Sequence, residues 1–297
     1  MIPERLKAAV PWWGKIAAKL VLSRLPLGYQ AWARANLFRH GTMDQPEQAL
    51  SVFARIHGIA SARATLPQGF VALELGPGDS LLGSVSAWGF GAGRILACDV
   101  GAFATTTLDG LRGLDALLRS RGLRALPLER AATPEEALAR IDVTYLTRGL
   151  EDLRALPEAS VDLVWSNAVL EHVRLGELGE TLLALARLLR PHGVMVHGVD
   201  FSDHLGGALN HLRFAPRLWE AEWFAARSGF YTNRVAPSDL LKAFIRAGLA
   251  AEVVHRETWP NIPTPRRALH PAFRHRNEED LRTRGLIVAA RRAATSH

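Results

Sequence analysis

The chain is poor in cysteine, and it contains no long uninterrupted run of apolar residues. Cys98 is its single cysteine, so no intrachain disulfide can form and a reducing, cytoplasmic location is expected. Because no run of about 18 apolar residues is present, we expect no membrane-spanning helix. The basic N-terminus has no short apolar stretch leading to a small-residue cleavage site, so we expect no secretion signal either.

Arginine supplies most of the positive charge. Lysine and arginine together number 36 against 29 acidic residues, which gives a formal net charge of +7. Apart from clusters near Arg266–Arg267 and Arg291–Arg292, the basic residues are scattered, and no basic stripe with interleaved aromatic residues is present. We therefore expect no nucleic-acid partner. The 48% hydrophobic fraction predicts an ordinary globular protein with a sizeable core.

Residues 1–66 are predicted to form an N-terminal helical extension. Apolar residues, including Trp12 and Trp13, recur near helical spacing between positions 12 and 25, with basic residues among them. The apolar stripe packs against the main domain or a second subunit, or else it lies on an anionic membrane surface at the inner face of the membrane. Both alternatives stay open, as does the oligomeric state.

From about residue 67 the pattern changes to short apolar strands that alternate with helices. Expected strands lie at 71–75, 94–100, 141–145, 161–167, 194–200, 251–257 and 285–292. The alternation predicts an α/β fold with a doubly wound, mostly parallel seven-stranded sheet over residues 67–297. The last two strands have no obvious crossover helix between them, which indicates one antiparallel strand. The sequence Thr133-Pro134-Glu135-Glu136 predicts a helix start with a capping box.

The segment ELGPGDS (74–80) follows the first expected strand. Its glycines, Gly76 and Gly78, can adopt positive φ and allow a ligand to approach the backbone. Leu81 stands where a dinucleotide-binding turn places its third glycine, which argues against a pyrophosphate ligand. Glu74 and Asp79 would repel a pyrophosphate but suit a ligand that carries a cationic amino group.

Asp99 ends the second expected strand, 23 residues after Gly76. This spacing is close to the roughly 20 residues at which an acid meets ribose hydroxyls in nucleotide-binding sheets. The turn and Asp99 together predict a ribose-binding site that disfavours anions. The alternative is that Glu74 and Asp99 only cap loops.

The chain at this point resembles the class I S-adenosylmethionine-dependent methyltransferases, whose sheet is Rossmann-like. ELGPGDS is similar to their glycine-rich first motif, SVDLVWSNAVLEHV (160–173) to their fourth-strand segment, and LLRPHGVMV (188–196) to the helix, turn and strand that follow. The resemblance covers residues 67–200 and implies S-adenosylmethionine as the cofactor.

The same resemblance implies roles for individual residues. The glycine turn would pass the methionine moiety with Glu74 orienting it, Asp99 would take the ribose hydroxyls, and Val100 would flank the adenine. Asp152 would lie near the adenine amine and Asn167 beside the methyl-transfer point. The implied cofactor site comprises Glu74, Gly76, Pro77, Gly78, Asp79, Asp99, Val100, Asp152 and Asn167.

Three further segments resemble bacterial methyltransferases that occur with surface-polysaccharide genes. These segments are LFRHGTMDQP (37–46), VDFSDHLGGALNHLRF (199–214) and GFYTNRVAPSD (229–239). The resemblance implies O-methylation of a sugar hydroxyl, within the broader expectation of a small-molecule acceptor.

A hydroxyl acceptor benefits from a general base, and histidines cluster where one is wanted. His172, His197, His204 and His211 fall at or after the carboxyl ends of strands four and five, where open α/β sheets bind ligands. His204 is the first candidate, because the neighbouring Asp203 could orient its imidazole; loop hydrogen bonding is the alternative.

His172 is the second candidate, together with Glu171. Leu170-Glu171-His172 resembles quinone-pathway methyltransferases, some of which hold a divalent metal in this region. Ala168 stands where a further acid would be needed, so we expect no metal. The alternative is that Glu171 and His172 only cap the following helix.

Residues 201–235 are predicted to form a lid over the acceptor. Trp219 and Tyr231 could stack on a sugar, and Arg213 could bind a carboxylate or phosphate, with Asp203 beside them. Alternatively these aromatic residues pack the N-terminal helices onto the sheet. Two rival functions also stay open: an NAD-dependent oxidoreductase on a similar sheet, and a cofactor-binding scaffold without catalytic activity.

Overall fold

The computed structural model describes residues 12–14, 43–225 and 231–293. Within them one seven-stranded sheet runs in the order β3-β2-β1-β4-β5-β7-β6. The strands are β1 (Val71–Leu75), β2 (Arg94–Cys98), β3 (Val143–Leu146), β4 (Val161–Asn167), β5 (Leu189–Asp200), β6 (Leu249–Thr258) and β7 (Thr283–Arg292).

The strand directions confirm the predicted fold class. β1 to β5 pair in parallel, whereas β7 runs antiparallel to both β5 and β6. The order in which the strands are added reverses between β1 and β4. From β1 the chain adds β2 and β3 on one side, and it then returns to add β4 and β5 on the other side. Ligands of open α/β sheets bind at the carboxyl ends of strands beside such a reversal.

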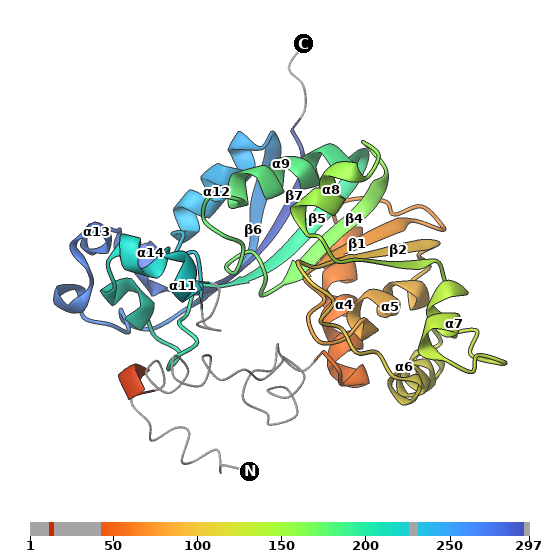
Figure 1. The fold of residues 1–297 in the computed structure, drawn as a ribbon. Helices are drawn as coiled ribbons and strands as arrows, with labels where there is room; N and C mark the ends of the chain where they lie inside the picture. Colours follow the sequence, from red (N-terminus) through yellow and green to blue (C-terminus); the bar gives the residue numbers. More distant parts are fainter. Residues whose placement is uncertain (1–11, 15–42, 226–230, 294–297) are drawn as a thin grey trace.

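Two helical layers cover the sheet (Figure 1). One layer comprises α4 (Pro46–Ser61), α5 (Leu82–Gly89), α6 (Leu108–Ser120) and α7 (Pro134–Ala139). The other comprises α8 (Leu150–Ala155), α9 (Leu178–Leu188) and α12 (Pro237–Arg246). Each layer buries an apolar core against the sheet, and burial of such surface is the main driving force for the fold.

Helix α4 packs directly on the sheet. Its side chains Phe53 and Ile56 are fully buried in a cluster with Trp165 and Val194. Pro46 occupies its first turn, where the missing N–H costs no helical hydrogen bond. Residues 46–61 of the expected N-terminal extension therefore belong to one helical layer of the main fold. A helical extension over residues 1–66 is otherwise not established, and most of residues 1–42 lies outside the described residues.

Several expected elements differ from the observed ones only at their ends. The fifth strand begins at Leu189 instead of residue 194, because Leu189 pairs with Val161 on the other side of a register shift. The Thr133 N-cap of α7 is confirmed, because its hydroxyl accepts from the Glu136 N–H; the Glu136 carboxylate accepts from the Ala132 N–H, one residue before the N-cap that a capping box would use.

Short helices follow β5 and β6 and form a group beside the carboxyl edge of the sheet (Figure 1). They are η1 (Asn210–Arg213), α10 (Pro216–Trp219), α11 (Glu222–Ala225), η2 (Arg266–Ala268), α13 (Pro271–Arg274) and α14 (Glu278–Arg282). Two small apolar clusters hold this group together, centred on Trp219 and on Leu269. No helix among the described residues is long and apolar enough to span a bilayer.

Candidate functional site

The glycine turn after β1 has the backbone that its sequence predicts. Gly76 and Gly78 have φ of +69° and +68°, in the left-handed region that side chains disfavour. The Gly76 N–H donates to the Cys98 carbonyl at 2.8 Å, which ties the turn to the end of β2. A Cβ on Gly76 would lie 2.6 Å from Val169 Cγ1, so the turn also touches the loop after β4.

Asp99 meets this turn from β2. Its carboxylate accepts the Gly78 N–H at 3.2 Å and the Val100 N–H at 2.7 Å. The Val100 side chain is 78% exposed, which is unusual for a large apolar residue. An exposed apolar side chain beside a carboxylate at the mouth of a glycine turn fits a nucleoside, whose ribose is polar and whose base is flat.

Tyr145 on β3 supports the loop that follows Val100. Its hydroxyl accepts the Phe103 and Ala104 N–H groups at 3.1 and 3.3 Å and donates to the Gly101 carbonyl at 2.9 Å. The sequence argument missed this residue, because nothing local to 143–146 marks it.

Glu74 lies beneath the turn. Its side chain is 3% exposed, and its carboxyl accepts a hydrogen bond from the Ser84 hydroxyl on α5. Burial raises the pKa of this carboxyl to about 8, so it carries a proton at neutral pH. Of the other turn residues, Asp79 accepts the Thr105 N–H with its main-chain carbonyl at 2.9 Å. Pro77 lies between the two glycines.

Asp152 stands at the first turn of α8 and is engaged by Arg148. It accepts the Arg148 main-chain N–H and Nε, both at 2.9 Å. The main-chain hydrogen bond is the largest cause of the lowered pKa of this carboxyl. The adjoining Gly149 N–H donates to the Asp99 carbonyl at 2.8 Å, so this loop lies beside Asp99.

An open pocket of about 250 Å³, which we call the β5 pocket, lies at the carboxyl ends of β4 and β5. Asn167, Ala168 and Asp200 line it from these strands and the loop after β4, and Gly198 and Gly285 lie beside them. A Cβ on Gly198 would lie 2.8 Å from Asn167 Oδ1, so glycine there leaves room for the amide.

Charged side chains from three other elements complete the β5 pocket. Arg55 on α4 donates to Asn167 Oδ1 at 3.3 Å, and Arg284 on β7 pairs with Glu257 on β6 at 2.9 Å. His255 on β6 also lines the pocket. The sequence did not predict a role for Arg55, Glu257, His255 or Arg284. The elements that carry them, α4, β6 and β7, are remote along the chain from the turn at residues 74–80.

His172 and His204 come together at the edge of the lid. Their Nε2 atoms lie 3.2 Å apart, and their rings stack with centroids 5.0 Å apart. His172 Nδ1 lies 2.8 Å from the Tyr231 carbonyl, which can only accept a hydrogen bond. Neutral His172 therefore carries its proton on Nδ1, and its Nε2 accepts the Nε2–H of His204.

Glu171 lies behind the end of β5. Its side chain is 4% exposed, and its Oε1 accepts the Asp200 N–H at 3.2 Å. Burial, with a smaller contribution from the nearby Asp200, raises the pKa of this carboxyl to about 8. Two other expected histidines, His197 and His211, are also buried, and burial lowers the pKa of each to about 3.

The predicted lid residues pack mainly against one another. Asp203 accepts main-chain N–H groups from Leu205, Gly206, Gly207 and Asn210, so it organises its own loop. Trp219 is fully buried and donates from Nε1 to the Thr232 carbonyl at 2.8 Å. Trp219 thus packs within the lid itself, and both its contact with an acceptor and the packing of the N-terminal helices onto the sheet by these aromatic residues stay predictions.

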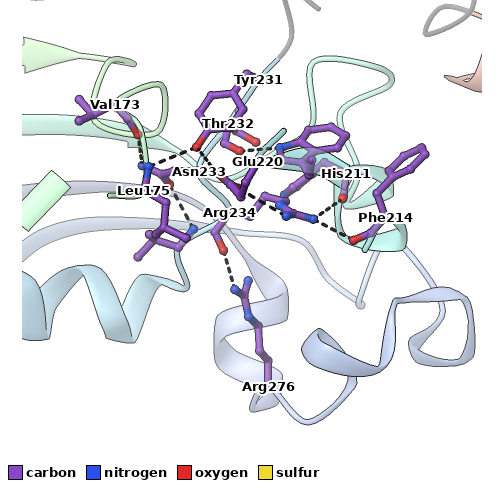
Figure 2. A network of polar contacts seen from close by, with 12 residues as sticks. Val173, Leu175, His211, Phe214, Glu220, Tyr231, Thr232, Asn233, Arg234 and Arg276 are labelled. Carbon is purple, nitrogen blue, oxygen red and sulfur yellow. Dashed lines mark hydrogen bonds and ion pairs between the residues drawn. The ribbon is translucent and has the colours of Figure 1, made fainter. Parts of the chain in front are cut away.

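The remaining two lid residues make contacts within the same group. The Tyr231 hydroxyl donates to Glu220 at 2.7 Å, and Arg213 lies over the Trp12 ring at 5.2 Å. Figure 2 shows Tyr231 to Arg234, which belong to the lid, between Val173 and Leu175 of the loop after β4 and His211 and Phe214 of the lid. No three His, Cys, Asp or Glu side chains of the described residues are grouped to hold a metal ion.

Comparison with known proteins adds a family match to this geometry. A family model described as a methyltransferase domain matches residues 118–197, which include β3, β4 and most of β5. No curated protein sequence matches the chain.

Several solved structures are similar to the chain. YcgJ from Bacillus subtilis has a TM-score of 0.45 and 14% identity, over 83% of this chain and 99% of that one. An S-adenosylmethionine-dependent methyltransferase from Mesorhizobium loti has a TM-score of 0.42 and 21% identity, over 82% and 96% of the two chains. Mitomycin 7-O-methyltransferase MmcR has a TM-score of 0.44 and 15% identity, over 97% and 70%.

The family match falls on the part of the sheet that adjoins the glycine turn and the β5 pocket. It matches the chain over these residues to a methyltransferase domain, and the strand order shows a doubly wound sheet with the glycine turn beside its reversal.

Proposed function

We propose that the protein transfers the methyl group of S-adenosylmethionine to a hydroxyl of a small molecule or of a glycan. The observation that carries this proposal is the continuity of residues 167–169. Asn167 and Ala168 line the β5 pocket, and Val169 packs against Gly76 of the turn. A cofactor held by the turn would therefore meet an acceptor in the β5 pocket across these three residues.

The cofactor supplies an electrophilic methyl group on a sulfonium. Asp99 is proposed to accept the ribose hydroxyls, Val100 to flank the adenine, and Gly76 and Gly78 to admit the methionine moiety. Asn167 is proposed to lie beside the methyl group, because it ends β4 between the turn and the pocket. Pro77 and Asp79 complete the turn, Glu74 supports it from below, and Asp152 supports the loop beside the adenine.

A glycan or another polyhydroxylated acceptor suits the chemistry of the β5 pocket. Asn167, Asp200 and Glu257 offer hydrogen-bond acceptors, whereas Arg55 and His255 offer donors. Hydroxyl groups both donate and accept, so a mixed lining fits them better than a lining of one charge. A surface-polysaccharide sugar is our specific proposal for the acceptor.

His204 is proposed to take the proton that the acceptor hydroxyl loses; because His204 does not line the β5 pocket, this role requires an acceptor that extends from the pocket to the lid. The hydrogen bond from His204 Nε2–H to His172 holds its imidazole and would stabilise the imidazolium formed on proton uptake. His172 is a positioning residue in this scheme, and Tyr231 fixes its tautomer. Glu171 supports the pocket from behind through Asp200.

The domain organisation belongs to the same proposal. Residues 67–297, together with the packed helix α4, are proposed to form the methyltransferase domain, and 201–235 its acceptor lid, with Asp203, Arg213, Trp219 and Tyr231 shaping the lid. Residues 1–66 precede it; Trp12 contacts Phe214 and Arg213 of the lid, which favours packing of this segment on the main domain, and contact with the inner face of a membrane is the alternative.

Isothermal titration with S-adenosylmethionine, and with NAD as the control, tests the cofactor site. We expect micromolar binding of S-adenosylmethionine and a loss of about 10- to 100-fold in affinity for Asp99→Ala, because hydrogen bonds to a charged group are lost. Asp142→Ala, which removes an exposed acid from the loop before β3, should bind normally. Preferential binding of NAD would support the oxidoreductase alternative instead. Cofactor binding without turnover of any glycan or small hydroxyl acceptor would support the scaffold alternative.

A further inference from the structure

Unpartnered polar atoms gather at one place inside the lid. Six buried side-chain nitrogen or oxygen atoms of the described residues have no hydrogen-bond partner. Four of them belong to Glu171, His211, Thr232 and Arg234, which line a single small cavity. The side chains of these four are between 4 and 6% exposed. Buried polar groups are nearly always paired in folded proteins, so this concentration calls for a ligand.

The cavity has the size of a solvent molecule. Its volume is about 20 Å³, and a water molecule needs roughly 10–15 Å³ on this measure. Organic ligands do not fit such a space. A resident cation is disfavoured, because Arg234 and Arg276 both line the cavity.

The four unpartnered atoms match the hydrogen-bonding capacity of one water. Arg234 Nε carries a proton and donates, and Glu171 Oε2 also donates when its carboxyl is protonated. His211 Nδ1 and Thr232 Oγ1 can accept the two water protons, with the His211 proton on Nε2. A water with two donors and two acceptors around it is fully satisfied.

We propose that this cavity binds an ordered water molecule, which joins Glu171 to Thr232, His211 and Arg234 and thereby ties the lid to the end of β5. The link continues through Glu171 Oε1, which holds the Asp200 N–H at 3.2 Å. Asp200 lines both the cavity and the β5 pocket. Glu171 is thus a positioning residue for the floor of the pocket.

The neighbouring main chain fixes the same segment, so the water has a rigid frame. The Asn233 N–H donates to the Glu171 carbonyl at 2.7 Å, and Asn233 Nδ2 donates to the Leu170 carbonyl. Asn233 Nδ2 also donates to the Val173 carbonyl (Figure 2). Arg234 Nη1 donates to the Phe214 carbonyl at 2.9 Å. None of these contacts uses the four unpartnered atoms.

Thr232→Val tests the proposal, because valine has the shape of threonine without its hydroxyl. If the water is present, the variant loses a partner of that water, and its unfolding constant in urea should rise about 5- to 50-fold. The matched control is Thr264→Val, whose hydroxyl accepts the Leu209 N–H directly at 3.1 Å and should show a loss of similar size. A dry cavity predicts the opposite: Thr232→Val would be as stable as the native protein or more stable, which would overturn the proposal.

Two further measurements test the water and its link to the pocket. A high-resolution crystal structure should contain solvent density within hydrogen-bond distance of at least three of the four atoms, and an empty cavity would overturn the proposal. Amide exchange of Asp200, followed by NMR, should accelerate in Thr232→Val but not in Thr264→Val. Equal exchange in both variants would overturn the positioning role of Glu171. Neither measurement depends on methyl transfer.

Discussion

The turn at residues 74–80 and the lid site around His172 differ in how they are built. The turn, Asp99 and Val100 lie within 27 residues of one another, and their geometry follows from two strand ends and two glycines with positive φ. The lid site joins residues that are remote in the chain: His172 meets His204 across 32 residues and the Tyr231 carbonyl across 59. Local backbone geometry therefore defines one site, and long-range side-chain contacts define the other.

Loss of the histidine pair should give the largest effect. His204→Ala removes the proposed base, and we expect the turnover number to fall by roughly 10²- to 10⁴-fold, with little change in cofactor affinity. The measurement is S-adenosylhomocysteine release with a hydroxyl acceptor, together with cofactor titration. His192→Ala, an exposed histidine at the other end of β5, is the matched control. An unchanged turnover number in His204→Ala would contradict the base assignment.

The contrast between the sites also explains how much the sequence could predict. The sheet, the turn and Asp99 were predictable, because strand periodicity and glycine spacing are local signals. The partner of His204 was not: Asp203 is its sequence neighbour, yet its carboxylate is taken by loop N–H groups, and His172 supplies the contact instead. Arg55, His255 and Arg284 reach the β5 pocket only because α4, β6 and β7 pack there, which no local pattern encodes.

The buried carboxyl of Glu171 should make stability depend on pH. Its pKa is about 8 in the folded protein and near 4.5 in the unfolded chain, so unfolding between these values releases a proton. The free energy of unfolding should therefore fall as pH rises from about 5 to 8, by up to about 1.4 kcal/mol per pH unit from this group. Glu171→Gln keeps the shape without the ionisation, and its stability should fall less over the same range.

Urea unfolding at pH 5, 6, 7 and 8 measures this difference. The comparison with Glu171→Gln removes the contribution of Glu74, whose pKa is also raised to about 8 and which both proteins retain. Parallel stability curves for the two proteins would show that Glu171 is ionised in the folded state. That result would mean that water reaches the Glu171 carboxyl in the folded protein.

A side chain at Gly76 should disturb the turn more than the lid. Gly76→Ala adds a Cβ at a φ of +69° and 2.6 Å from Val169, whose branched side chain has little freedom to move. We expect a loss of about 1–2 kcal/mol in the free energy of unfolding from the backbone alone, with a clear loss of cofactor affinity. Gly176→Ala is the control, since nothing lies within 4 Å of its Cβ position. Normal cofactor binding by Gly76→Ala would contradict close approach of the ligand to the turn.

The smallest expected effect separates two roles for Asp152. Its carboxylate accepts both the main-chain N–H and the Nε of Arg148, which orders the first turn of α8 beside the Asp99 carbonyl. Asp152→Asn keeps one acceptor oxygen and removes the charge, so we expect only a small loss of stability. Cofactor affinity should then fall only a few-fold, because the loop beside Asp99 shifts slightly. If the carboxylate instead binds the adenine amine directly, affinity would fall much more than stability does. Titration and urea unfolding of the same variant distinguish these outcomes, and Arg148→Ala sharpens them, since it weakens the loop while leaving the carboxylate in place.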